Sequence, residues 1–172
     1  MTVRAASADA ASAFEAIYRE HAERVFALLT RLLGPDRERE DLLQETFIRL
    51  HGALPRFRGD CSMTTFVYRI TTRVAIDHMR RRRPLAASDF SDEVDAGLTP
   101  AEHVARCEQL ARAVGLLAQL SPKHRVAFVL REVMGLSHEE IGTIVEAQPA
   151  AARMRVAKAK RVLAKLTAKE DR

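Results

Sequence analysis

Tryptophan is absent from this chain of 172 residues, and cysteine occurs only twice. Cys61 and Cys107 lie far apart and form no CxxC pair, so the sequence has neither a zinc-site spacing nor a disulfide framework. Two isolated thiols are typical of a reducing compartment. For Cys61 we expect a small buried or half-buried residue, with redox sensing as the alternative.

Long apolar runs are also missing, and none approaches the roughly 18 residues that a membrane-spanning helix needs. The N-terminal stretch lacks the hydrophobic segment and cleavage pattern of a signal peptide. Strictly alternating β-branched segments are absent, whereas apolar residues recur every three or four positions. With 47% hydrophobic and 30% charged residues, the chain is predicted to be a globular, all-α, cytoplasmic protein.

Acidic residues are missing from the last basic stretch. Between Ala147 and Lys169 there are seven lysines or arginines and no acid. Just upstream, Ser137–Val145 reads as a short helix with a capping box, and Pro149 stands where a second helix would begin. A short helix, a turn and a basic helix are typical of a helix-turn-helix that binds a DNA groove. The alternative is an amphipathic helix whose basic face is only solvated.

The charge distribution divides the chain. Residues 84–100 contain four acids and no base, lie between two prolines, and have the composition of a flexible linker. We therefore expect two small helical domains, at 1–83 and 101–172. The periodicity and stop signals predict helices over residues 14–33, 36–54, 63–83, 101–119, 121–134, 137–145 and from 149 onward.

Two stretches of the first domain contain further candidate sites. FVYRI at 66–70 leads toward four arginines at 80–83, which offers stacking faces and a positive track for single-stranded nucleic acid. The alternative is a core face followed by cations that favour a helix C-terminus. DLLQETF at 41–47 is acidic but has no accompanying catalytic constellation, so we expect a partner-binding or a plain solvated face rather than an enzyme site.

Taken in order, seven segments resemble the extracytoplasmic-function (ECF) sigma factors, the smallest members of the bacterial sigma-70 family. They are DLLQETF at 41–47, FRGD at 57–60, FVYRI at 66–70, DHMR at 77–80, LSPKHR at 120–125, LREVMGLS at 130–137 and EEI at 139–141. The resemblance implies a region-2 domain at 1–83 and a region-4 domain at 101–172. It also implies a non-enzymatic factor that directs core RNA polymerase to promoters. The alternative function is a stand-alone helix-turn-helix regulator, which leaves the 41–47 face without a role.

The resemblance further implies roles for individual residues. Core polymerase, through the clamp helices of its β′ subunit, would bind the face formed by Asp41, Gln44, Glu45 and the underlying Phe47. The minus-ten element would be melted and captured by Phe57, Asp60, Ser62, Phe66, Tyr68, Arg69, Arg73, Asp77 and Arg80. The minus-35 element would be read, beside the polymerase β flap, by Gln148, Arg153, Met154, Arg155, Ala157, Lys158 and Arg161.

An anti-sigma factor is a further expected partner, and a membrane-bound one would hold the protein at the inner membrane face. The resemblance implies no cofactor, metal ion or small-molecule substrate.

The chain departs from the family pattern at several positions. Phe66 stands where the family usually has Trp, and Arg73 where it often has Asn. Before the last helix, Glu146, Gln148 and Ala151 replace a glycine, a Ser-like cap and a threonine. Glu146 is expected to adopt a positive φ that glycine takes more easily. The resemblance therefore does not define the promoter sequence.

Overall fold

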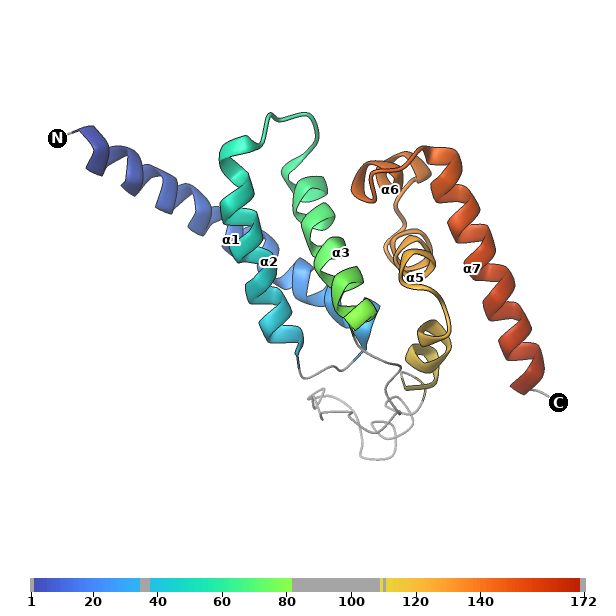
Figure 1. Ribbon diagram of the computed structural model, residues 1–172. Coiled ribbons are helices and arrows are strands. Elements are labelled where there is room, and N and C mark those ends of the chain that lie inside the picture. Colours follow the sequence, from blue (N-terminus) through green and yellow to red (C-terminus); the bar gives the residue numbers. More distant parts are fainter. Residues whose placement is uncertain (1, 35–37, 82–108, 110, 171–172) are drawn as a thin grey trace.

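The computed structural model describes residues 2–34, 38–81, 109 and 111–170, and every regular element in these ranges is a helix (Figure 1). The all-α prediction is therefore confirmed. The predicted acidic linker at 84–100 and Cys107 lie outside the described residues. No helix in the described ranges is long and apolar enough to cross a bilayer. The elements are α1 (Thr2–Leu33), α2 (Arg39–Ala53), α3 (Met63–Arg81), α5 (Pro122–Phe128), α6 (His138–Ile144) and α7 (Pro149–Glu170), with a further helical segment at residues 111–118.

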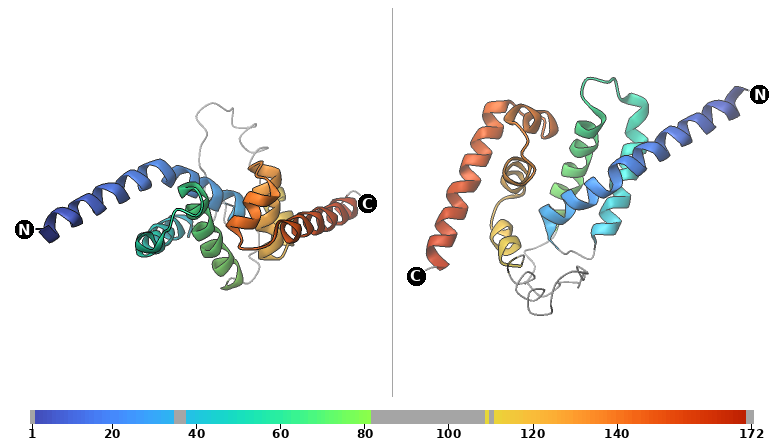
Figure 2. Two further views of the ribbon diagram at one scale, coloured as in Figure 1. Left: turned by 90° about the horizontal axis from the view of Figure 1, so that it is seen from above. Right: turned by 180° about the vertical axis from the view of Figure 1, so that it is seen from behind.

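Helix α1 crosses α2 and α3 and forms one wall of the N-terminal core. It buries an apolar stripe with helical spacing, made of Val25, Leu28, Leu29 and Leu32. The helix ends at Gly34, as predicted, because this residue adopts a φ of 76° that glycine takes without strain. Its start differs from the prediction, since the helix begins at Thr2 and its first half projects away from the other helices (Figure 2).

Helices α2 and α3 are connected by a short turn and a loop. Pro55 ends α2 by starting the 3₁₀ turn η1 (Leu54–Arg56). Ser62 then caps α3, because its Oγ accepts a hydrogen bond of 3.1 Å from the Thr65 backbone N–H. Helix α3 lies in contact with both α1 and α2, so it is the central helix of this half.

The helix-turn-helix of the C-terminal half forms as the sequence predicts. At Ser137 the capping box is complete, with the Ser137 and Glu140 side chains each accepting from the other residue's backbone N–H. Glu146 has a φ of 50°, which confirms the expected left-handed conformation. Helix α7 begins at Pro149 and packs on α5 and α6. Gly142 permits the tight turn, since a Cβ there would lie 2.7 Å from the Ala147 carbonyl oxygen.

One predicted helix is irregular. The helix that starts at Pro122 continues from Phe128 into a π-helical turn, η2 (Val129–Val133), before Gly135 ends it with a φ of 74°. The Leu136 N–H bonds back to the Leu130 carbonyl at 3.0 Å, which closes the turn ahead of α6. A single hydrophobic stripe did not indicate this local widening of the helix.

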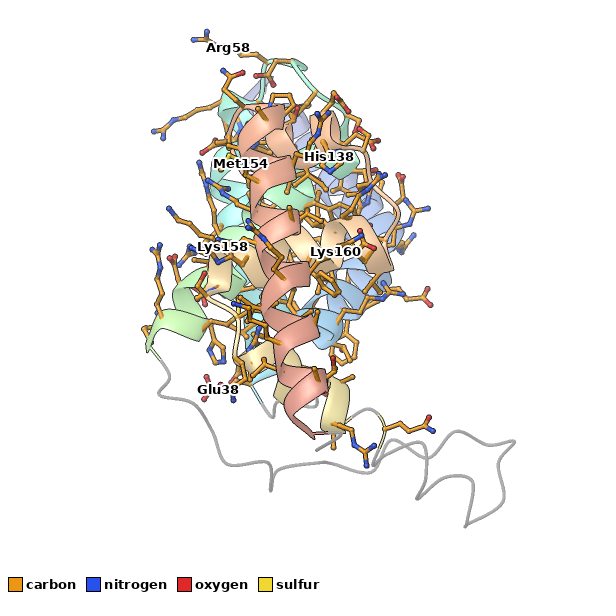
Figure 3. The ribbon with its side chains drawn as sticks, turned by 90° about the vertical axis from the view of Figure 1, so that its right-hand side faces the viewer. Glu38, Arg58, His138, Met154, Lys158 and Lys160 are labelled. Carbon is orange, nitrogen blue, oxygen red and sulfur yellow. The ribbon has the colours of Figure 1, made fainter. Side chains whose placement is uncertain are left out.

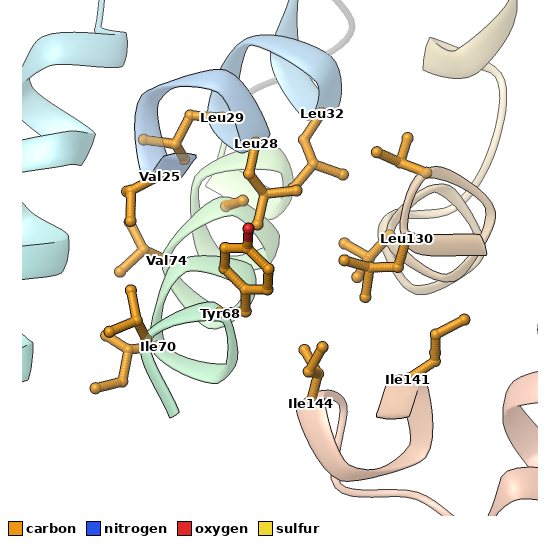
Figure 4. Close-up of a cluster of buried hydrophobic side chains, with 14 of the residues drawn as sticks. Val25, Leu28, Leu29, Leu32, Tyr68, Ile70, Val74, Leu130, Ile141 and Ile144 are labelled. Atoms are coloured by element: carbon orange, nitrogen blue, oxygen red, sulfur yellow. The ribbon is translucent and has the colours of Figure 1, made fainter. Parts of the chain in front are cut away.

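The two halves are packed against each other through a continuous core. Leu28 and Tyr68 from the N-terminal half belong to the same buried cluster as Leu130, Ile141 and Ile144 from the C-terminal half (Figure 4). We call this the closed arrangement, in which α3 lies against α5 and α6. The sequence indicated two domains but not that they meet.

Polar contacts join the halves near the end of α1. The buried guanidinium of Arg125 donates through Nη1 to the Leu32 carbonyl at 2.9 Å and through Nε to the Leu117 carbonyl at 2.8 Å. Burial lowers the pKa of Arg125 to about 10. The chain also approaches closely here, because a Cβ on Gly34 would lie 2.7 Å from Val114 Cγ1.

Candidate nucleic-acid and partner interfaces

The acidic motif lies on the outer surface of α2. Asp41 and Gln44 are exposed and Glu45 is half-buried. Phe47 is buried beneath them, where its ring lies 4.6 Å from that of Tyr18 and 6.3 Å from that of Phe14. The four predicted residues therefore form one surface with an aromatic base.

An apolar groove of about 510 Å³ adjoins this surface between α1 and α2. It is lined by Phe14, Tyr18, Glu40, Leu43, Gln44, Phe47, Ile48 and His51. Ile48 is 64% exposed, an unusual position for a large aliphatic side chain. Ile48 directly follows the 41–47 motif, but the sequence did not indicate the contribution of α1, which depends on tertiary packing.

Asp77 is held in an ion-pair network that joins α3 to α2. Arg49 of α2 lies 3.3 Å from Asp77 and 2.6 Å from Glu45, and Arg81 lies 4.0 Å from the other Glu45 oxygen. The structure thus connects one candidate minus-ten residue to one candidate polymerase-binding residue. Arg49 is an intermediary that the sequence did not single out.

The loop before α3 brings two predicted aromatic residues together. The rings of Phe57 and Phe66 lie 4.7 Å apart and are tilted by 32°, and both side chains are half-buried. Asp60 and Ser62 are exposed beside them. Tyr68 is placed differently, since it is 8% exposed and its ring lies in the core shared by the two halves.

The arginines of α3 differ in their surroundings. Arg80 is exposed near the end of the helix, whereas Arg73 forms an ion pair with Glu146. Arg69 is only 17% exposed, and its Nη1 lies 3.9 Å from the second Glu146 oxygen. Its buried Nε has no hydrogen-bond partner among the described residues.

The free thiol of Cys61 lies beside this cluster. Arg69 Nη2 approaches Cys61 Sγ at 3.7 Å, and burial raises the pKa of the Cys61 thiol despite that cation. A raised pKa lowers the thiolate fraction that oxidants attack. The structure therefore favours a half-buried structural cysteine over a redox sensor.

Helix α7 presents its cations on an open face. Ala152, Val156 and Ala159 are buried against the remainder of the half, and Met154 is 72% exposed. The exposed predicted residues are Gln148, Arg153, Met154, Ala157, Lys158 and Arg161, while Arg155 is half-buried. Figure 3 shows Met154 and Lys158 along this helix. The structure thus brings six of the seven minus-35 candidates to the surface.

A basic hollow of about 530 Å³ lies between η2, α6 and α7. Arg131, His138 and Arg153 line it, together with Lys160, whose Nζ forms an ion pair with Glu132 at 2.9 Å. Arg131 is fixed in place because its Nη1 donates to the Leu136 carbonyl at 2.8 Å. Arg131 and His138 were not predicted as site residues, although Arg131 lies inside the LREVMGLS motif.

These surfaces have no metal-binding chemistry in the described residues, where no group of three or more His, Cys, Asp or Glu could hold an ion. What they offer is an acidic and apolar groove at one end and arginine-rich helices elsewhere. Grooves and basic helix faces of this kind are typical of surfaces that bind macromolecules.

Comparison with known proteins decides the family. Residues 17–84 match Sigma-70 region 2, and residues 110–163 match Sigma-70, region 4. The RNA polymerase sigma-H factor of Pseudomonas aeruginosa is 31% identical over 166 residues, which cover 89% of this chain and 85% of that relative. This chain belongs to the ECF sigma factors of the sigma-70 family. As such a factor it is not an enzyme, and it directs promoter-specific transcription initiation by RNA polymerase.

Two further relatives extend the comparison. This sigma factor is 33% identical to the ECF RNA polymerase sigma factor SigE of Mycolicibacterium smegmatis, over 92% of its own length and 63% of that relative. The solved structure of the sigma factor RpoE from Bartonella quintana, in complex with the anti-sigma factor NepR, has the same fold with a TM-score of 0.64. That likeness covers 92% of this chain and 98% of RpoE at 20% identity.

Proposed function

We propose that residues 1–83 bind core polymerase and melt the minus-ten element, that residues 101–172 read the minus-35 element, and that residues 84–100 link the two. The two family matches follow this division, at 17–84 and 110–163, and only residue 84 of the first match reaches into the proposed linker. The observation that carries the proposal is the combination, on one chain, of an apolar groove beside an acidic helix face with a separate open basic helix.

The polymerase-binding surface is the outer face of α2 with the adjoining groove. Asp41, Gln44 and Glu45 supply polar contacts, and the exposed Ile48 beside Phe47 supplies an apolar anchor. An apolar groove flanked by charge suits an amphipathic helix of a partner protein. The β′ clamp helices are the proposed occupant, and the β flap is the proposed contact of the C-terminal half.

The minus-ten surface is the loop at 57–62 together with α3. The Phe57–Phe66 pair provides a stacking platform for an unpaired base, and Asp60 and Ser62 lie beside it. Arg69, Arg73 and Arg80 are proposed to hold the DNA backbone, and Asp77 to position α3 through Arg49. Tyr68 would contact DNA only after the closed arrangement opens, because it is covered by the core.

The minus-35 surface is the open face of α7. Arginine recognises the guanine edge, and apolar side chains recognise the thymine methyl group. Arg153 and Met154 lie near the helix start and are both exposed, so we assign them to base edges. Arg155, Lys158 and Arg161 are assigned to phosphate, and Gln148 and Ala157 to the groove walls.

We expect the protein to act in the cytoplasm and to be controlled by an anti-sigma factor, which would hold it at the inner membrane face if membrane-bound. The structure of RpoE with the anti-sigma factor NepR supports this expectation for a related fold. A stand-alone helix-turn-helix regulator remains the competing function, but it leaves the groove of α1 and α2 without an occupant.

Reconstituted transcription tests the proposal. The chain with core polymerase should start transcription at specific promoters, and Ile48→Glu should weaken core binding about tenfold or more by placing a charge in the apolar contact. Because Ile48 is exposed, the fold should be unaffected. Glu23→Lys, at an exposed position of α1 outside the groove, is the control. Failure to initiate at any promoter, with tight duplex binding by the free chain, would instead establish the stand-alone regulator.

A further inference from the structure

We propose that the free chain is self-inhibited by Glu146, whose carboxylate in the helix-turn-helix turn occupies Arg73 and Arg69 of α3 and competes with promoter DNA for them. This inference rests on the proposed function, because it takes the two arginines as DNA contacts. It goes further by assigning a regulatory role to a residue that the family pattern would replace by glycine.

The backbone fixes the place of the carboxylate. Glu146 follows α6 with a φ of 50°, and the adjacent residues are held by hydrogen bonds of 2.9 Å from Val145 N–H to the Ile141 carbonyl and from Ala147 N–H to the Gly142 carbonyl. A left-handed conformation is unfavourable for a residue with a Cβ. Glutamate therefore holds this position at a backbone cost, and its carboxylate forms an ion pair with Arg73.

The Glu146 carboxylate stands in for a DNA phosphate. Both groups present anionic oxygens that accept hydrogen bonds from guanidinium N–H groups in the same geometry. One Glu146 oxygen pairs with Arg73, and the other lies 3.9 Å from Arg69 Nη1. A phosphate that approaches these two side chains must therefore compete with the carboxylate for their N–H donors.

Arg69 is poorly satisfied in this arrangement. Its side chain is 17% exposed, its Nε lacks a hydrogen-bond partner among the described residues, and its Nη2 reaches only the weak acceptor Cys61 Sγ. A buried cation with an unpaired donor gains strongly from a closer anion. The Glu146 contact is therefore a replaceable one, which suits a competitive inhibitor.

The closed arrangement cannot serve promoter DNA at both surfaces. From minus 35 to minus ten is about 25 base pairs, or roughly 85 Å of straight duplex at about 3.4 Å per base pair. In the structure α3 touches α6 and α6 packs on α7. Two helix spacings of about 10 Å each place α3 and α7 only about 20 Å apart. Engagement of both elements therefore requires α3 and α6 to separate.

Separation of α3 from α6 would expose a further minus-ten candidate besides the two arginines. Tyr68 lies in the core near Leu130 and Ile144, so the same separation uncovers a third minus-ten candidate (Figure 4). Closure thus removes Arg69, Arg73 and Tyr68 from use together, while the open face of α7 is unaffected. Self-inhibition acts on the minus-ten surface alone.

Glu146→Gln tests the competition, since it removes the charge and keeps the size and the backbone strain. The free full-length chain, without polymerase, is titrated at low salt with a fluorescent single-stranded minus-ten oligonucleotide. We expect Glu146→Gln to bind roughly two- to fivefold more tightly, the range of one exposed ion pair. Glu139→Gln is the matched control, because it removes the same charge from the other end of α6. Glu139→Gln should increase the affinity for the oligonucleotide less than Glu146→Gln does.

A double-mutant cycle with Arg73→Gln decides the cause. If Glu146 acts by occupying Arg73, Glu146→Gln should change DNA affinity far less in the Arg73→Gln background than in the wild-type background. An equal gain in both backgrounds, or no gain in either, would overturn the proposal. Glu146→Gly also relieves the positive φ. It should bind DNA as tightly as Glu146→Gln, because the proposal depends on the charge alone.

The holoenzyme separates this inference from the proposed function. Transcription by core polymerase with Glu146→Gln should match the wild type, because the holoenzyme has already opened the chain. Loss of initiation by the wild type itself would refute the sigma function. Normal initiation with no effect of Glu146→Gln on the free chain would refute only the self-inhibition.

Discussion

Helices α3 and α7 are the two arginine-bearing helices assigned to DNA, and the fold places them in opposite ways. Helix α3 is central, with Val67, Ile70 and Val74 among its buried residues, and its Arg69 and Arg73 are shielded or paired. Helix α7 lies at the outer edge of the molecule and buries small residues on one side (Figure 2). Helix α3 thus contributes to the core and most of its DNA-binding candidates are covered or paired, whereas those of α7 are accessible. The contrast suits a protein whose duplex-binding surface is available before its minus-ten surface.

The largest expected effect is on the free energy of unfolding, and it tests the difference in packing between α3 and α7. Ile70→Ala in α3 should lower the free energy of unfolding by about 2–5 kcal/mol, because it leaves a cavity in a close-packed core. Leu163→Ala, at a half-buried position of α7, should cost less than about 2 kcal/mol. Urea unfolding of the full-length variants measures both. Equal losses would mean that α7 is as much a part of the core as α3.

The next effect concerns the open face of α7. Arg153→Ala should reduce discrimination between promoters by about 1–3 kcal/mol, as expected for loss of a contact to a base edge. Arg161→Ala should weaken binding uniformly and lower the salt dependence by about one counterion, as expected for a phosphate contact. Competition binding of holoenzyme to a panel of minus-35 variants distinguishes the two. A uniform loss for Arg153→Ala would reassign it to phosphate.

The smallest effect compares a histidine from each half. His21 on α1 is fully buried, neither ring nitrogen has a hydrogen-bond partner among the described residues, and desolvation lowers its pKa. The pKa of His124 on α5 is lowered first by burial and then by Lys158 and Arg155 of α7. The folded chain therefore takes up these protons at lower pH than the unfolded chain, whose histidines titrate near 6.5.

Stability should accordingly fall as the pH drops below about 6.5, by at most about 1.4 kcal/mol per pH unit for each histidine. His21→Leu should flatten this slope and should not destabilise at pH 7.5, because it removes two buried nitrogens that make no hydrogen bond among the described residues. Added salt should reduce only the part of the His124 shift that arises from α7. Denaturant midpoints between pH 5 and 7.5 measure both slopes, and an unchanged slope for His21→Leu would contradict the assignment.

Local chemistry explains why much of the secondary structure was predictable. The capping box at Ser137, the stop at Gly34 and the start at Pro149 each depend on residues within one turn. The sequence did not indicate the early start of α1 at Thr2 or the π-helical turn η2, which lack such a local signal. The positive φ of Glu146 was predictable for the same local reason, but its partner was not.

The candidate sites also differ in how far the local sequence predicts them. The exposed face of α7 follows from helical periodicity, because its apolar and basic residues occupy opposite sides of one helix. The groove beside Ile48 needs α1 and α2 together, and the burial of Tyr68 needs both halves. A sequence motif therefore located each surface but did not show which side chains were accessible in it.

By itself the sequence determined the helices, the helix-turn-helix with its basic second helix, and the family, because periodicity, caps and motif order are local properties. Only the tertiary structure decided that Arg73 meets a carboxylate 73 positions away and that Arg125 reaches the Leu32 carbonyl 93 positions away. Such contacts depend on how two apolar faces pack, and no local pattern encodes that choice.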